Sequence, residues 1–311
     1  MFRLPPGHRL AYPRDVHRTD HRFAFPAIII GSCALAFGPW LVRLSGTGPV
    51  AAGFWRMGLA LPFLFVIAAT TRQPVHWPGR KLALLVASAA FFFAADLAAW
   101  HVGIRMTKLG NATLFGNVSS FAFAGWGLWL ARRPPSRTQA LALGLAAAGA
   151  ALLMSSSFEL SPRHFTGDLL CLFAGLLYTG YLIAVQKGRG SLKPLPLLFL
   201  ASLFGAAMLL PVSLLLGEQV IPHDWTYVLL LALGSQVIGQ GLLVYGIGHV
   251  PPLIVGLVLL TQPAISAFVG WAAYGETLAP VDWLGAAALG AAIVLVRLPA
   301  RGLREPAVQP S

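Results

Sequence analysis

Long apolar stretches recur along almost the whole sequence, and they constrain the fold of this chain more than any other feature. A helix needs about 20 apolar residues to cross the hydrocarbon core of a bilayer. The sequence therefore predicts an all-α polytopic membrane protein of ten transmembrane helices. The predicted spans are 24–42, 49–70, 82–100, 109–131, 139–155, 168–187, 195–216, 226–247, 253–274 and 282–297.

The composition excludes a water-soluble domain as the main body of the chain. Of the 311 residues, 57% are hydrophobic and only 10% are charged, whereas a soluble domain has about 25% charged residues. The net charge of +12 does not indicate a nucleic-acid partner, because the basic residues lie in short loops and tails rather than on one folded face. Cys33 and Cys171 fall inside predicted spans, so we expect no disulfide framework.

Lysine and arginine residues gather on one side of the predicted topology. With the N-terminus inside, 17 of the 22 lie in cytoplasmic loops and tails, four lie in outer loops, and Arg56 lies inside the second span. Basic residues accumulate on the cytoplasmic side of membrane proteins. We therefore predict a bacterial inner-membrane protein with both termini in the cytoplasm. The first apolar run lacks a clear cleavage site, which favours an uncleaved span over a signal peptide.

An internal repeat is visible at an offset of 141 to 145 residues. Residues 37–42 align with 178–183, residues 102–104 with 245–247, and residues 123–126 with 268–271. Because each half has five spans, the second half is inverted relative to the first, as in secondary transporters with a midplane site. The predicted domains are a cytoplasmic tail (1–22), a first five-helix repeat (23–157), a second inverted repeat (166–298) and a cytoplasmic C-terminal tail (299–311).

Motifs in both halves carry a family resemblance. Leu259-Leu260-Thr261-Gln262-Pro263-Ala264 is followed by Gly275-Glu276-Thr277-Leu278 and Trp283-Leu284-Gly285, and the first half has Pro49, Arg56 and Asn111-Ala112-Thr113. The first half departs at Arg132-Arg133-Pro134-Pro135, which replaces the Gly-Glu pair. Over residues 24–297 the chain resembles the EamA-type branch of the drug/metabolite transporter superfamily. The resemblance implies a basket whose cavity is lined mainly by spans 1, 3, 4, 6, 8 and 9, with spans 5 and 10 as scaffold.

Polar side chains near the bilayer midplane are the candidates for a substrate site. Amide groups in hydrocarbon need hydrogen-bonding partners or a water-filled cavity. Gln236 and Gln240 are four residues apart, so we expect them on one face of the eighth helix. Hydrogen bonding between helices is the alternative use of such groups. The predicted substrate-binding residues are Ser32, Trp100, Asn117, Tyr178, Gln236, Gln240 and Gln262.

Asp96 is the only carboxylate well inside a predicted span. An intramembrane acid is a functional candidate by default, and Asp96 is our candidate for proton coupling. The alternative is a structural ion pair with Arg56 or Arg105, and Arg56 itself is open to a functional or a snorkelling interpretation. Asp168 and Asp282 begin predicted spans, where we interpret them as helix N-caps.

The inverted halves and the polar midplane residues predict a secondary transporter for small metabolites that works by alternating access, and the family resemblance suggests export, most of all of amino acids. An efflux carrier for other metabolites or drugs is the alternative among transporters, and a passive channel or an intramembrane enzyme is the alternative from other classes. The sequence has no GxSxG, HExxH or GxxxxGK[ST] motif, so we expect no enzyme activity, metal, cofactor or ATP coupling. The expected partners are a small-molecule substrate and the lipid bilayer, without nucleic acid, for a monomer or homodimer.

Overall fold

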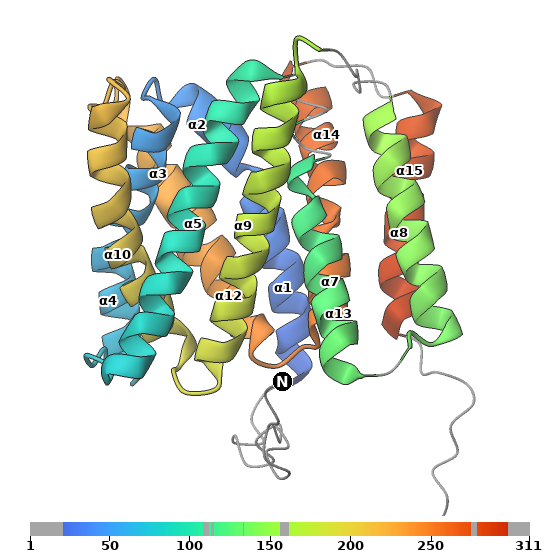
Figure 1. The fold of residues 1–311 in the computed structure, drawn as a ribbon, viewed down its shortest axis with the longest axis horizontal. Helices are drawn as coiled ribbons and strands as arrows, with labels where there is room; N and C mark the ends of the chain where they lie inside the picture. The colour runs from blue at the N-terminus through green and yellow to red at the C-terminus, as the bar shows by residue number, and fades with distance from the viewer. Residues whose placement is uncertain are drawn as a thin grey trace, which may run out of the picture.

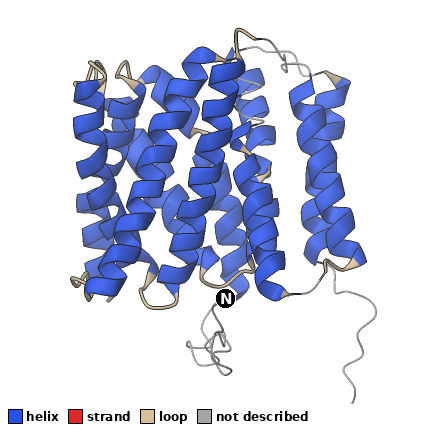
Figure 2. Cartoon of the chain, viewed as in Figure 1, coloured by secondary structure: helices blue, strands red, loops and turns tan. Residues whose placement is uncertain are grey.

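The structure is a computed structural model that describes residues 21–107, 112, 115–132, 134–155, 162–274 and 279–297. Within these residues every regular element is a helix and no strand is present (Figure 2). The start of the predicted fourth span, the motif at 275–278, and most of both tails lie outside the described residues. The helices are α1 (His21–Ala36), α2 (Gly38–Leu44), α3 (Pro49–Gly58), α4 (Ala60–Thr70), α5 (Arg80–Met106), α7 (Val118–Ala131), α8 (Arg137–Ser155), α9 (Phe165–Arg189), α10 (Pro194–Leu215), α11 (Trp225–Leu231), the π-helix η1 (Ala232–Gln240), α12 (Gly241–Ile247), α13 (Pro252–Leu259), α14 (Thr261–Tyr274) and α15 (Pro280–Arg297).

Six stretches of the described chain are long and apolar enough to cross a membrane, with a mean hydropathy of 1.7 to 2.2. They are Arg22–Val42, Pro49–Thr70, Arg80–Met106, Phe165–Arg189, Pro194–Leu215 and Trp225–Ile247. Four shorter apolar helices accompany them: Val118–Ala131, Arg137–Leu153, Pro252–Ile265 and Pro280–Val296. The prediction of an all-helical multi-pass membrane protein is confirmed, while the count of ten complete spans stays a prediction.

The outer surface of the bundle is apolar, and this follows from the solvent that such a chain faces. Large hydrophobic side chains are exposed on many helices, among them Phe65, Leu84, Phe173, Leu215 and Val294. A soluble monomer rarely exposes apolar patches on this scale, whereas lipid tails accommodate them. The main buried cluster lies inside, among α1, α3, α5, α9, α10, α12 and α13.

Prolines mark three interruptions of the apolar stretches. Pro39 lies in the first turn of α2, Pro62 in that of α4, and Pro263 in that of α14. A proline lacks the backbone N–H and its ring clashes with the carbonyl four residues earlier, so a straight helix does not continue through it. Pro211, in contrast, lies inside the single helix α10. The first and third of these interruptions lie beside the cavity described below.

Helices of the first half pack mainly against helices of the second half: α5 against α9, α8 against α15, α7 against α13, α3 against α10, and α1 against η1 and α12. Two of these contacts are equivalent. A Cβ placed on Gly103 would lie 3.1 Å from the carbonyl oxygen of Gly167, and one placed on Gly246 would lie 3.1 Å from that of Ala24. Gly103 and Gly246 are separated by the same number of residues as Ala24 and Gly167. The contact between Gly103 and Gly167 therefore recurs at the repeat offset as the contact between Gly246 and Ala24.

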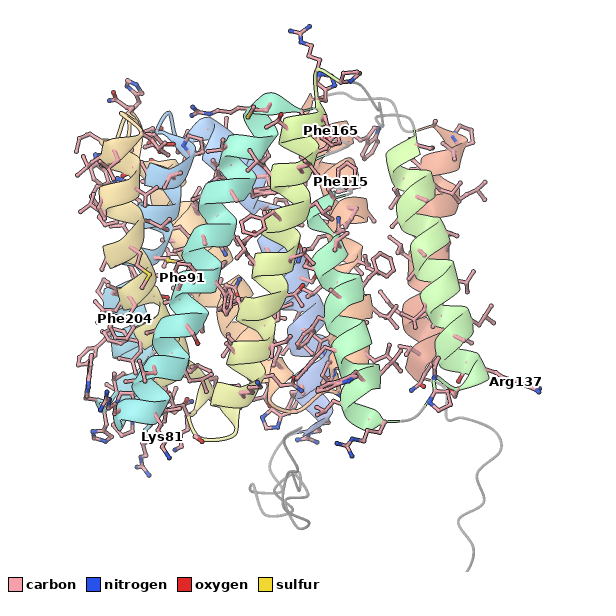
Figure 3. All side chains as sticks on the ribbon, viewed as in Figure 1. Lys81, Phe91, Phe115, Arg137, Phe165 and Phe204 are labelled. Carbon is pink, nitrogen blue, oxygen red and sulfur yellow. The ribbon has the colours of Figure 1, made fainter. Side chains whose placement is uncertain are left out.

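The first helices of the two halves, α1 and α9, cross the bundle in opposite directions. In Figure 1, α1 begins at the lower end of the bundle and α9 begins at the upper end. Figure 3 labels Phe165, the first residue of α9, at the upper end, and labels Lys81 and Arg137, at the starts of α5 and α8, at the lower end. This opposite sense is what an inverted repeat requires.

The helices α8 and α15 form a tightly packed pair at one edge of the bundle (Figure 1). A Cβ placed on Gly149 would lie 2.8 Å from the carbonyl oxygen of Gly285, and a Cβ on Gly285 would lie 2.8 Å from that of Gly149. Small residues allow membrane helices to approach this closely. A second hydrophobic cluster, which includes Ala146 and Leu289, connects the pair to α7 and α13.

Candidate functional site

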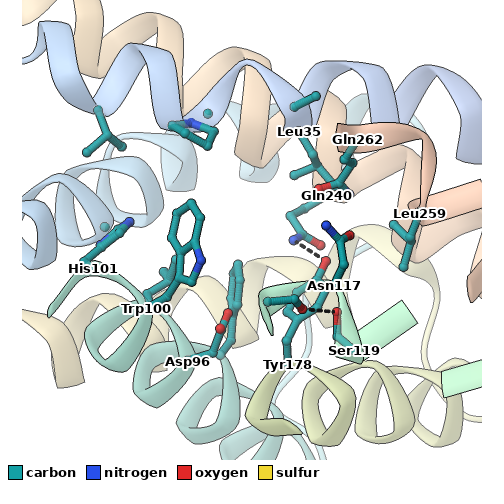
Figure 4. Close-up of a pocket in the computed structure, with 18 of the residues that line it drawn as sticks. Leu35, Asp96, Trp100, His101, Asn117, Ser119, Tyr178, Gln240, Leu259 and Gln262 are labelled. Carbon is teal, nitrogen blue, oxygen red and sulfur yellow. Dashed lines mark hydrogen bonds between the residues drawn. The ribbon is translucent and has the colours of Figure 1, made fainter. Parts of the chain in front are cut away.

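A cavity of about 170 Å³ lies between the two halves (Figure 4). Its wall is made by residues of α1, α2, α3, α5, α7, α9, α11, η1, α13 and α14, together with the residues just before α7. The described residues of α8 and α15 contribute nothing to it. Sites for drug-sized ligands have volumes of roughly 300–1,000 Å³, so this cavity suits a smaller metabolite.

Five of the seven predicted substrate-binding residues line the cavity, and so does Asp96. The five are Trp100, Asn117, Tyr178, Gln240 and Gln262 (Figure 4). They come from α5, from the segment that precedes α7, and from the helices α9, η1 and α14. The fold therefore brings together residues that are far apart in sequence. Their contact with a substrate stays a prediction.

Ser32, the sixth predicted residue, is fully buried on α1 and bonds between helices. Its hydroxyl shares a 3.0 Å hydrogen bond with the hydroxyl of Thr261 and donates to the carbonyl oxygen of Val258 at 3.3 Å. These contacts attach α1 to the point where α13 ends and α14 begins. Ser32 therefore bonds between helices, which the sequence analysis gives as the alternative to substrate binding.

Gln236, the seventh predicted residue, lies behind the cavity wall and holds a cation that forms part of that wall. Its side-chain oxygen accepts a 3.0 Å hydrogen bond from Nε of Arg56, and its Nε2 donates to the hydroxyl of Ser202 at 2.9 Å. Gln236 and Ser202 are both almost fully buried. Because the amide nitrogen is engaged by Ser202, the amide oxygen is the atom that faces Arg56.

Gln240 connects η1 to a pair of tyrosines on α9. Its Nε2 donates to the hydroxyl of Tyr178 at 3.3 Å, and its side-chain oxygen accepts from the hydroxyl of Tyr181 at 3.1 Å. The ring of Tyr181 stacks on that of Phe93 with a centroid separation of 4.5 Å. Phe93, Tyr178 and Gln240 line the cavity, and Tyr181 lies behind them.

Gln236 and Gln240 both lie in the π-helix η1, four residues apart, and they have different partners. Gln236 is directed to α3 and α10, whereas Gln240 is directed to α9. Only Gln240 lines the cavity. π-helical segments are rare and are frequent at functional sites.

Asp96 lies on the cavity face of α5, together with Phe93, Leu97 and Trp100. Residues three and four apart share one face of an α-helix, and this explains how one helix supplies both the carboxyl and the rings. Among the described residues, neither a hydrogen bond nor an ion pair within 4 Å joins the carboxyl of Asp96 to a partner. The structural alternative of a direct ion pair with Arg56 is therefore absent from this conformation, although both groups line the same cavity.

Three contacts between helices lie toward the lower end of the bundle, away from the cavity. The indole nitrogen of Trp126 on α7 donates to the side-chain oxygen of Gln186 on α9 at 3.0 Å, and the ammonium of Lys187 lies 5.6 Å from a Trp126 ring centroid. Nε of Arg189 donates to the carbonyl oxygen of Val244 on α12 at 3.0 Å. These contacts join α9 to its neighbours on the side opposite its first residue.

The two acids interpreted as N-caps have other roles. His164, not Asp168, is the N-cap of α9, and the carboxylate of Asp168 accepts a 2.6 Å hydrogen bond from the hydroxyl of Thr107. Asp282 lies in the first turn of α15 and accepts from the backbone N–H of Ala279 at 2.8 Å. Asp282 therefore stabilises the helix start by reaching back, as the third residue of a capping box does.

Comparison with known proteins agrees with this architecture. Residues 23–155 and residues 165–298 each match the EamA-like transporter family. The chain belongs to this family. It is therefore a membrane transporter and not an enzyme, and the two matches place one copy of the EamA unit in each half. The EamA-type resemblance drawn from the sequence motifs is confirmed.

Individual relatives share this classification. An uncharacterized transporter of Archaeoglobus fulgidus is 24% identical over 274 residues, which cover 88% of this EamA-family chain and 96% of that protein. The threonine/homoserine exporter RhtA of Escherichia coli K12 is 26% identical over 197 residues, which cover 62% of this chain and 63% of RhtA. A solved crystal structure has the same fold, with a TM-score of 0.76 at 13% identity over 91% of this chain and all of that one.

The sequence analysis left several residues that line the cavity without an assigned role. Arg56 and Gly53 bring α3 into the wall, and His101 lies beside Trp100 on α5. His101 is buried, and its Nδ1 has no hydrogen-bond partner among the described residues. A titratable ring inside an apolar run was a signal available in the sequence. The role of Arg56 had no such signal in the sequence, because it depends on a hydrogen bond to a partner 180 residues away.

Proposed function

We propose that this protein is a secondary transporter that exports amino acids by alternating access. The observation that carries the proposal is the pair of opposite charges in the cavity wall: the guanidinium of Arg56 and the carboxyl of Asp96 line one cavity without pairing with each other. An amino acid is the small metabolite that brings a carboxylate and an ammonium together. The two protein charges are complementary to it.

The remaining wall suits the same class of substrate. Asn117, Gln240 and Gln262 offer amide donors and acceptors, which can bond a polar substrate group in either sense. Trp100 and Leu259 offer apolar surface for a side chain. An organic cation matches this cavity less well, because Arg56 would repel it; this argues against the alternative of cationic drug efflux.

The direction of transport and the class of substrate also rest on a relative. RhtA is named a threonine/homoserine exporter, and it shares 26% identity over part of its length with this chain. Export of amino acids by the present protein is the corresponding proposal. The substrate within that class is left to experiment.

The topology proposed for this mechanism has ten spans in two inverted repeats, at 23–157 and 166–298. The bias of basic residues supports a topology with both termini in the cytoplasm of a bacterial cell, in which the lower end of Figure 1 is the cytoplasmic end. In this topology the Trp126–Gln186 contact joins the two halves on the cytoplasmic side of the cavity. Alternating access by motion of one half against the other requires such a contact to break in the inward-facing state.

Counterflow in proteoliposomes tests the proposal. Vesicles that contain the purified protein are loaded with one unlabelled amino acid and diluted into its radiolabelled form, for each of the twenty amino acids in turn. We expect transient accumulation of label for at least one of them, and none in protein-free vesicles. Absence of counterflow for all twenty would overturn the proposal.

A further inference from the structure

Arg56 is held inside the membrane with most of its hydrogen-bonding capacity unused. A guanidinium has five N–H donors, and the structure gives Arg56 one hydrogen bond, from Nε to Gln236. Its Nη2 is buried and has no partner among the described residues. Cations within membrane spans are costly and usually mark a substrate or ion pathway. The N–H donors without a partner therefore indicate that Arg56 binds a ligand.

The surroundings of Arg56 fix the direction of its free donors. The guanidinium carbon lies 5.4 Å from the ring centroid of Phe93, a cation–π distance. Gln236 holds Nε from the other side, and Ser202 in turn fixes Gln236. With one edge engaged by an amide and one face covered by a ring, the guanidinium is oriented before any substrate arrives. A carboxylate can then bind without a cost for ordering a flexible side chain.

Asp96 provides the complementary group at the same cavity. Its carboxyl has neither a hydrogen bond nor an ion pair within 4 Å among the described residues. Asp96 and Arg56 both line the cavity without pairing with each other. A molecule that carries both signs on neighbouring atoms can engage both groups together.

We propose that Arg56 binds the carboxylate of the transported amino acid through the N–H groups of its guanidinium, that Asp96 binds its ammonium, and that Gln236 is the residue that positions Arg56. This inference rests on the proposed function and assigns an orientation to the substrate. The side chain of the amino acid is directed to the apolar part of the wall, at Leu97 and Trp100. The recognised unit is the free α-amino acid, rather than an amine or a carboxylic acid alone.

The test compares amino acids with derivatives that lack one charge. L-threonine, L-leucine and L-phenylalanine, with their methyl esters and N-acetyl forms, compete against counterflow of whichever labelled amino acid the wild-type protein exchanges best. The variants are Arg56→Gln, Arg56→Lys and Asp96→Asn. The control is Arg105→Gln, because Arg105 is exposed at the end of α5. Melting temperatures in detergent show which variants are folded.

We expect the wild-type protein and the control to prefer the free acid over both derivatives. Loss of a charge-assisted hydrogen bond weakens binding by about 10- to 100-fold. Arg56→Gln should therefore weaken binding of the free acid to the level of the ester, without changing binding of the ester. Asp96→Asn should weaken binding of the free acid to the level of the N-acetyl form, without changing binding of the N-acetyl form. Arg56→Lys keeps the charge but loses the planar fork, and should give an intermediate preference.

Two results would overturn the inference while leaving the proposed function in place. One is a wild-type protein that exchanges amino acids but binds the methyl ester as well as the free acid. The other is a folded Arg56→Gln or Arg56→Lys protein with the wild-type preference for the acid. If the wild-type protein exchanges no amino acid, the proposed function itself fails, and this inference fails with it.

Discussion

Arg56 on α3 donates a 3.0 Å hydrogen bond to Gln236 on the π-helix η1, across 180 residues of sequence. The bond joins one half of the protein to the other inside the membrane. The sequence suggests Gln236 as a substrate ligand, whereas in the structure Gln236 bonds a cation that lines the cavity. The same amide completes a chain to Ser202 on α10.

Replacement of Gln236 by leucine should lower both stability and transport. The variant removes the acceptor of Arg56 and the donor of Ser202, and a hydrogen bond to a charged group contributes about 1.5–3 kcal/mol. We expect a lower melting temperature in detergent and slower counterflow. Gln219→Leu is the matched control, because the side chain of Gln219 is exposed and, among the described residues, bonds only to the nearby Ile221 carbonyl. Equal melting temperatures for the two variants would contradict the role of Gln236.

Gln240 and Tyr181 should be energetically coupled. Tyr181 is fully buried, and its hydroxyl donates to Gln240, so removal of either partner leaves the other unsatisfied. In a double-mutant cycle of Gln240→Leu and Tyr181→Phe, we expect a coupling of about 0.5–3 kcal/mol in unfolding free energy. The control cycle pairs Gln240→Leu with Thr70→Ala, since Thr70 bonds only within its own helix. Additive effects in the first cycle would show that the observed bond contributes no stability.

The sequence predicts the helices of this protein better than it predicts the use of its polar groups. Apolar length alone identifies the six long stretches, because the cost of unpaired backbone groups in lipid leaves the helix as the available structure. Cavity residues such as Asn117, Gln240 and Gln262 can also be found, since large amides at midplane depth are unusual. Depth, however, does not show which neighbour an amide will face.

Ser32, Gln236 and Arg56 illustrate this limit. Each of the three bonds to a residue in the other half of the chain, and only tertiary packing brings these partners together. Gln236 and Gln240 show the same limit within one helix. They are four residues apart, but Gln236 bonds to α3 and α10 whereas Gln240 bonds to α9, because different helices pack beside each of them.

Asp96→Asn should separate proton coupling from substrate exchange. The amide cannot take up or release a proton, so accumulation driven by a pH gradient should be abolished. Exchange should persist at reduced affinity, because the cavity keeps Arg56 and its amides. Both activities are measured in the same proteoliposomes. A stable Asp96→Asn protein with normal gradient-driven accumulation would remove Asp96 from the coupling mechanism.

Gly149→Ala should loosen the pair formed by α8 and α15. The new methyl group would lie 2.8 Å from the carbonyl oxygen of Gly285, and overpacking of this kind costs about 1–3 kcal/mol. Gly144, on the same helix, has no neighbour within 4 Å of an added Cβ, so Gly144→Ala is the matched control and should be neutral or stabilising. Melting temperatures in detergent distinguish the two. A Gly149→Ala protein as stable as the control would contradict the close approach.

Efflux from intact bacteria tests the central claim, that this protein exports amino acids through the Arg56 and Asp96 cavity. Cells that express the wild-type protein or Arg56→Gln at matched membrane levels are loaded with dipeptides, which intracellular peptidases release as free amino acids. The amino acids that appear in the medium are then quantified over time. We predict faster release of at least one amino acid from wild-type cells than from cells without the protein, and loss of that increase with Arg56→Gln. Equal release from all three strains, for every amino acid, would contradict the account.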